Sequence, residues 1–272
     1  MRSVNSIGKI TKAMKMVAAA KLKGVQRVQE KARPFGVGMD TFFSGMNALE
    51  VPPASDGAEK PKELLVAVNS DRGLCGGVNG NVVKMVMKQI DAKGQHEGLK
   101  ILLVGDKGRD ALTRRAGNHI ITSFKDVFRA PITFDQASVI AEEIMKDEYN
   151  RITIVYNKFR SVISQEVTAG VVPGLEFMTS HAEVFDKYEF EAEVNSEEVL
   201  VDLFELKLAS QLYAACLENG TSEQAARMSA MDNASRNARD MLGKLTLNYN
   251  RQRQANITQE LGEIVAGSEA LK

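Results

Sequence analysis

The residues whose types could support chemistry lie closest together in one short segment, residues 70–77 (SDRGLCGG). The segment follows an apolar run and precedes a helical stretch, which is the setting of a phosphate-binding loop. Gly73, Gly76 and Gly77 could let the backbone approach an anion. However, the segment lacks the G-x-x-x-x-G-K-[ST] and G-x-G-x-x-G spacings, and it lacks an acidic partner at the right place. We therefore interpret it as a tight structural turn.

The other candidate groups are too scattered to form a reactive cluster. Residues 105–108 (GDKG) are a second loop between a predicted strand and a predicted helix, and Asp106 is suited to cap that helix. Cys75 and Cys216 give neither a disulfide framework nor a metal-ligand spacing, and we expect both thiols to be reduced. The three histidines do not cluster; they are His96, His119 and His181. The sequence therefore predicts no catalytic residue, no metal and no cofactor.

Composition and charge are those of a folded protein rather than a nucleic-acid binder. The 272 residues are 44% hydrophobic and 26% charged, and 35 basic side chains balance 35 acidic ones. The apolar runs are shorter than the roughly 20 residues that cross a bilayer, so we expect no direct membrane span. The basic charge is concentrated near the start, where residues 1–33 carry nine basic side chains against one acid. Such a run is usually a solvated face, with a membrane- or RNA-directed face as the alternative. Residues 1–22 resemble a transit peptide in composition, but their regularity favours mature structure.

The pattern of the sequence predicts two long helices, one at each end of the chain. In residues 1–50, a 3-4-3-4 spacing predicts a coiled-coil seam, which Ile10, Val17 and Leu22 widen. The seam residues are Val4, Ile7, Thr11, Met14, Ala18, Lys21, Val25, Val28, Ala32 and Phe35. Pro34 predicts a kink or a local end in this helix.

A second seam of the same period runs through the C-terminal helix, which we place at residues 197–272. Its members are Met228, Met231, Ser235, Ala238, Leu242, Leu245, Tyr249 and Gln252. Gly220 and the two residues that follow favour a break in this helix. Because both helices leave the same central domain, we expect them to pair antiparallel. The C-terminal helix has a surplus of about 20 residues, or roughly 30 Å. In that surplus, Ile257, Leu261, Ile264 and Val265 are out of phase with the seam and predict a different apolar partner surface.

The central part predicts an α/β domain at residues 63–196, after a linker at residues 51–62 that is rich in proline. Short apolar runs at residues 63–69, 99–105 and 151–157 predict buried strands, and residues 163–172 suit an edge strand. Helical stretches at about residues 79–93, 107–116 and 133–147 lie between them. The predicted fold is thus α/β: a long antiparallel two-helix coiled coil of the N- and C-terminal helices, with a central Rossmann-like α/β domain.

Four separated motifs resemble the gamma subunits of F-type ATP synthases, in the same order along the chain. They are residues 9–21 (KITKAMKMVAAAK), residues 70–76 (SDRGLCG), residues 227–235 with Arg227, Met228 and MDNAS, and residues 257–268 with ITQE, Glu263 and Gly267-Ser268. The resemblance covers essentially the whole chain. Residues 104–107, 134–140 and 157–164 resemble the mitochondrial type, and the cysteine pair of the chloroplast type is missing. The family normally begins some residues before the motif at Lys9, so Met1 is expected to be an internal position of a longer mature chain.

The resemblance implies a non-catalytic rotor of the central stalk, which couples proton flow to ATP synthesis on other chains. Implied partners are the alpha and beta subunits of the catalytic hexamer, small central-stalk subunits and the membrane c-ring, without nucleic acid. The implied location is the matrix side of the mitochondrial inner membrane. Residues implied to contact a catalytic subunit are Arg227, Arg253, Gln254, Thr258 and Glu260, and the seam is represented by Met14, Val17, Leu242 and Leu245. The alternative is a small α/β enzyme with helical extensions that make it oligomerise.

Overall fold

The structure is a computed structural model that describes residues 1–47, 62–93, 98–185, 188 and 196–270. Apart from residue 62, the predicted linker lies outside the described residues. The chain divides into two compact units, one of Met1–Val17 with Met228–Lys272 and the other of Ala18–Arg227. Both terminal helices contribute to both units. The boundaries at residues 50, 62 and 196 stay a prediction.

The larger unit is built on a five-stranded sheet with the strand order β3-β2-β1-β4-β5. The strands are β1 (Glu63–Val68), β2 (Leu99–Val104), β3 (Ile120–Phe124), β4 (Arg151–Phe159) and β5 (Gln165–Pro173). Neighbouring strands from β3 to β4 are parallel, and β5 pairs antiparallel with β4 at the edge. The predicted α/β domain and its edge strand are therefore confirmed, and the structure adds that this edge strand is antiparallel. The sequence prediction missed β3, because its residues are mostly half-buried and lack a continuous apolar run.

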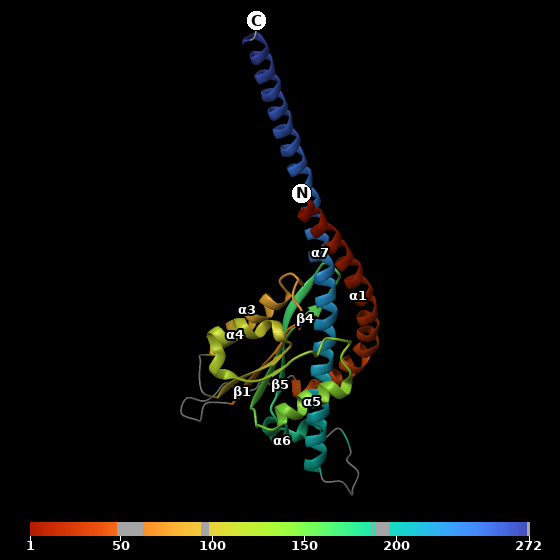
Figure 1. The fold of residues 1–272 in the computed structure, drawn as a ribbon. Coiled ribbons are helices and arrows are strands. Elements are labelled where there is room, and N and C mark those ends of the chain that lie inside the picture. The colour runs from red at the N-terminus through yellow and green to blue at the C-terminus, as the bar shows by residue number, and fades with distance from the viewer. Residues whose placement is uncertain (48–61, 94–97, 186–187, 189–195, 271–272) are drawn as a thin grey trace. The chain divides into compact units, whose positions relative to one another are not determined.

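Helices cover both faces of this sheet (Figure 1). One face carries α3 (Val78–Lys93) and α4 (Arg109–Ala116), which pack on Leu65, Ala67 and Val155. The other face carries α5 (Phe134–Met145), α6 (Leu175–Ser180) and the first part of α7 (Ser196–Ala270). Since side chains alternate between the faces of a strand, β1 is buried along its whole length and serves both cores. Three short 3-10 turns complete the unit, at Asp106–Gly108, Gly117–His119 and Ala182–Phe185.

The two terminal helices are less interrupted than their sequences predict. Helix α1 spans Arg2–Phe42 and continues through Pro34, and the short α2 (Ser44–Asn47) follows. Helix α7 also runs unbroken past Gly220, which corrects the predicted break. The α carbon of Gly220 lies in the interior, where an added Cβ would reach ordinary contact with Phe128 and Val25. Tertiary packing of this kind outweighs the roughly 1 kcal/mol helix penalty of a glycine.

In the smaller unit, the two helices run antiparallel. Ser235 Oγ donates to the carbonyl of Gly8 at 3.3 Å, and Lys15 Nζ lies 2.6 Å from a carboxylate oxygen of Asp232. Advancing along α1 from residue 8 to residue 15 therefore means moving back along α7. This confirms the predicted antiparallel pairing of the N- and C-terminal helices.

Candidate functional site

The helix pair of the smaller unit is held together by small side chains at its closest approach. Gly8 faces Ala238, so that a Cβ on Gly8 would lie 3.5 Å from the Cβ of Ala238. Ile7, which the 3-4-3-4 pattern placed in the seam, is 52% exposed instead. Sequence reasoning missed Gly8 because the 3-4-3-4 pattern placed its neighbour Ile7 in the seam. A glycine opposite an alanine lets two helix backbones come close, which a large side chain would prevent.

The other predicted seam residues are divided between the seam and the surface. Met14, Leu242 and Leu245 are half-buried. Val17 is 58% exposed, which corrects its placement. It precedes the buried Ala18 by one position, and one residue turns an α-helix by about 100°, so Val17 lies on a different face. Beside the seam, the hydrogen bond from Lys15 holds the pKa of the Asp232 carboxyl below its ordinary value.

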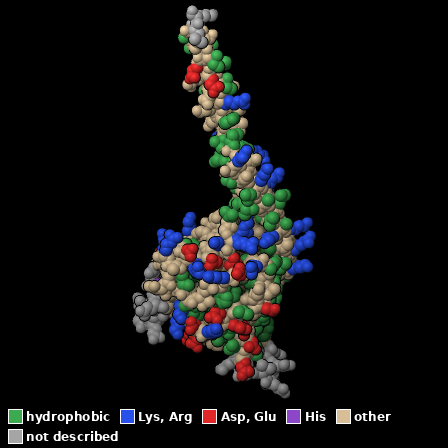
Figure 2. All heavy atoms as spheres, viewed as in Figure 1, with side chains coloured by type: hydrophobic (Ala, Val, Ile, Leu, Met, Phe, Trp, Pro, Cys, Tyr) green, Lys and Arg blue, Asp and Glu red, His purple; other side chains and the backbone are tan. Residues whose placement is uncertain are grey.

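Beyond the paired part, α7 presents its side chains to solvent. Every residue from 247 to 268 is exposed, including the predicted contact residues Arg253, Gln254, Thr258 and Glu260. Thr258 Oγ1 donates to the carbonyl of Gln254 at 2.9 Å, so its hydroxyl turns back onto the helix. Exposed apolar side chains lie along the same stretch, among them Leu261 at 57% and Ile264 at 68%. Figure 2 shows such side chains between basic and acidic ones at the surface of this segment. The assignment of these residues to a partner contact stays a prediction.

The basic run of the sequence forms an exposed face of α1. Within the larger unit, Lys21, Lys23, Arg27, Lys31 and Arg33 are all exposed. On the side of the molecule drawn in Figure 2, Lys and Arg side chains gather at the edge where Figure 1 draws α1. This face can attract an acidic surface over about a Debye length, roughly 8 Å in physiological salt.

The loop at residues 70–77 is fixed by one carboxylate. Asp71 accepts hydrogen bonds from the backbone N–H groups of Asp106, Asp126 and Phe128, at 3.3, 3.0 and 2.8 Å. It thereby ties the loop after β1 to those after β2 and β3. Cys75 is buried behind the loop, and burial raises the pKa of its thiol. A thiol in this state is a poor nucleophile, so the segment is a braced turn, as the sequence indicates.

Arg227, one of the residues predicted to contact a partner, closes this loop from α7. Its guanidinium donates to the carbonyls of Arg72 and Gly73 at 3.2–3.4 Å and also bonds Glu223. Arg227 is 9% exposed and Glu223 is 2% exposed. Burial raises the pKa of Glu223 even though Arg227 favours the ionised carboxylate. The guanidinium of Arg227 therefore makes internal bonds, and its contact with a partner stays a prediction.

The crevice where a doubly wound α/β fold would bind a ligand is filled by α7. Such crevices open at the carboxyl ends of the strands, where helices pass to opposite faces of the sheet. Here that point lies between β1 and β4, because α3 leaves β1 on one face and α5 enters β4 from the other. Asn157 Nδ2, near the end of β4, donates to Asn219 Oδ1 of α7 at 2.8 Å. Ser222 Oγ of α7 donates to the carbonyl of Asn157 at 3.0 Å. All three residues are at most 1% exposed.

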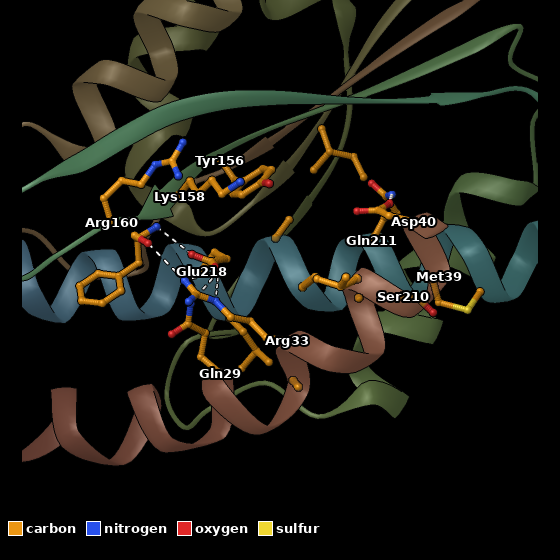
Figure 3. A pocket seen from close by; sticks show the side chains of 18 residues that line it. Gln29, Arg33, Met39, Asp40, Tyr156, Lys158, Arg160, Ser210, Gln211 and Glu218 are labelled. Atoms are coloured by element: carbon orange, nitrogen blue, oxygen red, sulfur yellow. Dashed lines mark hydrogen bonds and ion pairs between the residues drawn. The ribbon is translucent and has the colours of Figure 1, made fainter. Parts of the chain in front are cut away.

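A second polar cluster joins α1, β4 and α7 (Figure 3). Glu218 accepts hydrogen bonds from Gln29 at 2.6 Å, from Arg33 at 3.3 Å and from the backbone N–H of Phe159 at 2.7 Å. A cavity of about 420 Å³ opens beside this cluster. In Figure 3, Lys158 and Arg160 lie on the strand side of the cavity, and Asp40 and Gln211 lie at its other end. The cluster connects three elements through one carboxylate.

Sequence reasoning also missed a buried lysine near the start of α7. Lys207 is 1% exposed, and its ammonium lies 4.4 Å from the centre of the Phe43 ring. Burial lowers the pKa of this lysine to about 8, and the nearby Asp40 carboxylate partly offsets the effect. The surrounding pattern offered no signal for it, because lysine on a helix is normally solvated.

Two further tests bear on the kind of site. Among the described residues, three or more His, Cys, Asp or Glu side chains do not gather anywhere in a way that could hold a metal ion. Within that same part of the chain, none of the helices is both long and apolar enough to cross a membrane. The built features are instead a helix pair with an exposed extension and the polar clusters that fix α7 to the sheet.

Comparison with known proteins identifies the family. The family model described as "ATP synthase" matches residues 1–271. The chain is 42% identical to an ATP synthase gamma chain of Paramagnetospirillum magneticum, covering 99% of this chain and 96% of that one. It is 39% identical to the mitochondrial ATP synthase subunit gamma of Arabidopsis thaliana, covering 100% of this chain and 83% of that one. The chain belongs to the ATP synthase gamma-chain family, which confirms the resemblance found in its four motifs.

Solved structures support the same assignment. A chain in the central stalk and c-ring structure of the Tetrahymena thermophila mitochondrial ATP synthase is 33% identical and superposes with a TM-score of 0.71. The match covers 83% of this chain and 99% of that one. A chain of the Euglena gracilis mitochondrial ATP synthase is 19% identical with a TM-score of 0.66, and this likeness supports the fold alone.

Proposed function

We propose that this chain is the central-stalk rotor subunit of a proton-translocating F-type ATP synthase. In this role it couples rotation driven by proton flow to ATP synthesis on the catalytic subunits. The observation that carries the proposal is the match to gamma chains over essentially the whole sequence. Its partners are the alpha and beta subunits of the catalytic hexamer, the small central-stalk subunits and the c-ring.

The helices supply the part that acts on the catalytic subunits. A two-helix pair is not symmetric, so it presents a different face to each of three catalytic subunits around it. If each face stabilises a different conformation of a nucleotide site, turning the helices changes the three affinities in sequence.

Arg253 and Gln254 are proposed to contact a catalytic subunit in only some rotary positions. Both side chains are exposed, so they are accessible to a partner. Arginine offers a planar fork of donors that suits a carboxylate, and glutamine offers both a donor and an acceptor. A charge-assisted hydrogen bond contributes roughly 1.5–3 kcal/mol once it is shielded from water by the partner. Thr258 and Glu260, also exposed, belong to the same proposed contact.

The chain is proposed to act without a catalytic site of its own. The α/β crevice, where the alternative enzyme would bind its substrate, is filled by Asn219 and Ser222 of α7. The buried thiol of Cys75 is similarly disfavoured as a nucleophile by its raised pKa. These features favour mechanical coupling over the alternative of a small oligomeric α/β enzyme.

The proposed location is peripheral, on the matrix side of the mitochondrial inner membrane. The mitochondrial relative in Arabidopsis and the mitochondrial-type motifs at residues 104–107, 134–140 and 157–164 support it. Relatives in bacteria such as Paramagnetospirillum magneticum are about as similar, so location has to be tested in the source cell. Fractionation with protease protection of sealed mitoplasts distinguishes the matrix side from the opposite side.

Purification of the complex through a tag on this chain tests the proposed function. The expected result is co-purification of alpha and beta subunits with the c-ring, and ATP-driven proton uptake when the complex is placed in vesicles. Recovery of the chain as a separate oligomer, with saturable nucleotide binding and without those subunits, would contradict the proposal and favour the enzyme alternative.

A further inference from the structure

We propose that the filled crevice is a joint that carries torque between the sheet and α7. The joint consists of the side chains of Asn157, Asn219 and Ser222 together with the backbone carbonyl of Asn69. The proposal rests on the proposed rotor function. A rotor driven at its α/β unit must pass the torque into α7, and the joint is where the ends of two sheet strands bond that helix directly.

The joint lies at the carboxyl ends of β1 and β4, where α7 crosses the sheet. Strands β1 and β4 are parallel neighbours, with Ala67 opposite Val155. The same register carried forward by two residues places Asn69 beside Asn157 at the carboxyl ends of the strands. Helix α7 crosses these ends with Asn219 and Ser222, three positions apart and so on one side of the helix.

The hydrogen bonds of the joint connect α7 to both strands. Asn219 Oδ1 accepts from Asn157 Nδ2 at 2.8 Å, while Asn219 Nδ2 donates to the Asn69 carbonyl at 3.3 Å. Ser222 Oγ adds the 3.0 Å bond to the Asn157 carbonyl. Asn157 Nδ2 also lies 3.4 Å from the carbonyl of Val78, at the start of α3. One amide of α7 is thus held from two sides, so rotation of α7 about its own axis would break bonds on both strands.

Polar groups suit this role better than an apolar contact would. Apolar burial is non-directional and lets packed surfaces slide, whereas hydrogen bonds weaken steeply away from their preferred angle. Burying amides at 0–1% exposure is unfavourable unless they are hydrogen-bonded, and replacing both partners of such a bond with apolar side chains of similar shape can be nearly neutral in stability. What the asparagines add is a fixed orientation.

The surroundings of the joint are rigid. An added Cβ on Gly105 would lie 2.4 Å from the Asn69 carbonyl oxygen, and one on Gly108 would lie 2.2 Å from the Asn69 side chain. The two glycines therefore press directly against Asn69 and hold its carbonyl in place. On the other side, Arg227 bonds the carbonyls of Arg72 and Gly73, so the next turns of α7 are fixed to the loop after β1.

The test uses Asn219→Leu in the assembled complex, with Asn237→Leu, an exposed asparagine of the same helix, as the matched control. A rod is attached to the α/β unit, the rotor is stalled at a catalytic dwell, and the angular spread of the rod is recorded. Proton pumping per ATP hydrolysed and amide exchange at residues 155–157 and 219–222 are measured in the same preparations. We expect a wider angular distribution, a loss of pumping per ATP with hydrolysis retained, and exchange faster by about tenfold. The control should match the unmodified complex in all three measurements.

Ser222→Ala provides a second variant that changes little volume, with Ser229→Ala as its control. If the Asn219→Leu complex fails to assemble, Ser222→Ala is the variant that tests the joint. Changes in angular spread, pumping per ATP and amide exchange that are smaller than those expected for Asn219→Leu, but in the same direction, support the joint. If an intact variant complex matched the unmodified complex in angular spread, pumping per ATP and amide exchange, the proposal of a torque-carrying joint would be overturned. This outcome is distinct from failure of the proposed function, in which the unmodified complex itself would neither rotate nor pump.

Discussion

Removal of the Glu218 carboxylate should weaken the attachment of β4 to α7. Hydrogen exchange at the backbone amide of Phe159 should show this weakening. Glu218 is 8% exposed and accepts hydrogen bonds from three residues on two elements, Gln29 and Arg33 of α1 and Phe159 of β4. In Glu218→Ala, the backbone N–H of Phe159 and the side-chain amide of Gln29 lose their acceptor. Arg33 also loses a partner, but its side chain is 51% exposed and regains water.

The expected loss of stability follows from the burial of the two donors that are left without an acceptor. A buried donor without an acceptor costs about 1–3 kcal/mol, so two donors cost about 2–6 kcal/mol. The exposed Arg33 pair adds less than about 1 kcal/mol. Because the 420 Å³ cavity opens beside Glu218, water can reach the vacated position. We therefore expect the lower end of the range, about 2 kcal/mol.

Hydrogen exchange at the Phe159 amide in the assembled complex measures this loss. A change of about 2 kcal/mol in opening free energy corresponds to about 30-fold faster exchange. Glu218→Gln keeps one acceptor oxygen and should show a smaller acceleration. Asp202→Ala, an exposed acid of the same helix, should leave the Phe159 amide unchanged. If the amide in Glu218→Ala exchanged within twofold of the unmodified rate in an intact complex, the assigned role of Glu218 would be refuted.

Three further predictions concern separate parts of the chain. Burial lowers the pKa of Lys207 to about 8 from 10.5, so the unfolded chain binds more protons between these values. The free energy of unfolding should therefore rise with pH over that window by up to about 3 kcal/mol. Denaturant titrations at pH 8 and pH 10 measure this rise, and the free energy of unfolding of Lys207→Met should depend less on pH. Gly105→Ala forces a side chain into a backbone with φ of 91° and against the Asn69 carbonyl, and should lower the unfolding free energy by about 2 kcal/mol or more. Gly73→Ala, where an added Cβ meets open space, should be nearly neutral in the same titration. Replacing Arg253 and Gln254 with alanine should reduce ATP turnover by about one decade with normal subunit stoichiometry, whereas unchanged turnover would assign the pair to solvated surface.

Much of the fold could be predicted because it depends on pattern. The buried strands at residues 63–68 and 99–104 are continuous apolar runs, and the end helices repeat with a clear period. The errors in the predicted helices and strands arose where tertiary packing, rather than the local sequence, decides the secondary structure. Gly220 signals a helix end in isolation, yet it lies in a packed interior where α7 continues. Strand β3 has too few apolar residues to stand out from a loop, and its pairing with β2 is what makes it a strand.

The candidate site was harder to predict, because its residues act through partners far away in the sequence. Asn157 and Asn219 are separated by 62 positions, and although Asn157 ends a predicted buried strand, the sequence does not indicate that Asn219 bonds to it. Arg227 was assigned to a partner contact by the family resemblance, and its bonds to the carbonyls of Arg72 and Gly73 could not be predicted because they join positions about 155 residues apart. The exposed residues near Arg253 are a different case, because the surface that would bind them belongs to another chain.

Direct observation of rotation tests the central claim most closely. The complex is fixed to a surface through its catalytic subunits, and a rod is attached to an exposed position of the α/β unit, such as Asp110 replaced by cysteine. Addition of ATP should turn the rod in one direction with three dwells per turn, and loss of nucleotide should stop it. A rod that shows only thermal motion while the same complex hydrolyses ATP would contradict the account of this chain as the rotor.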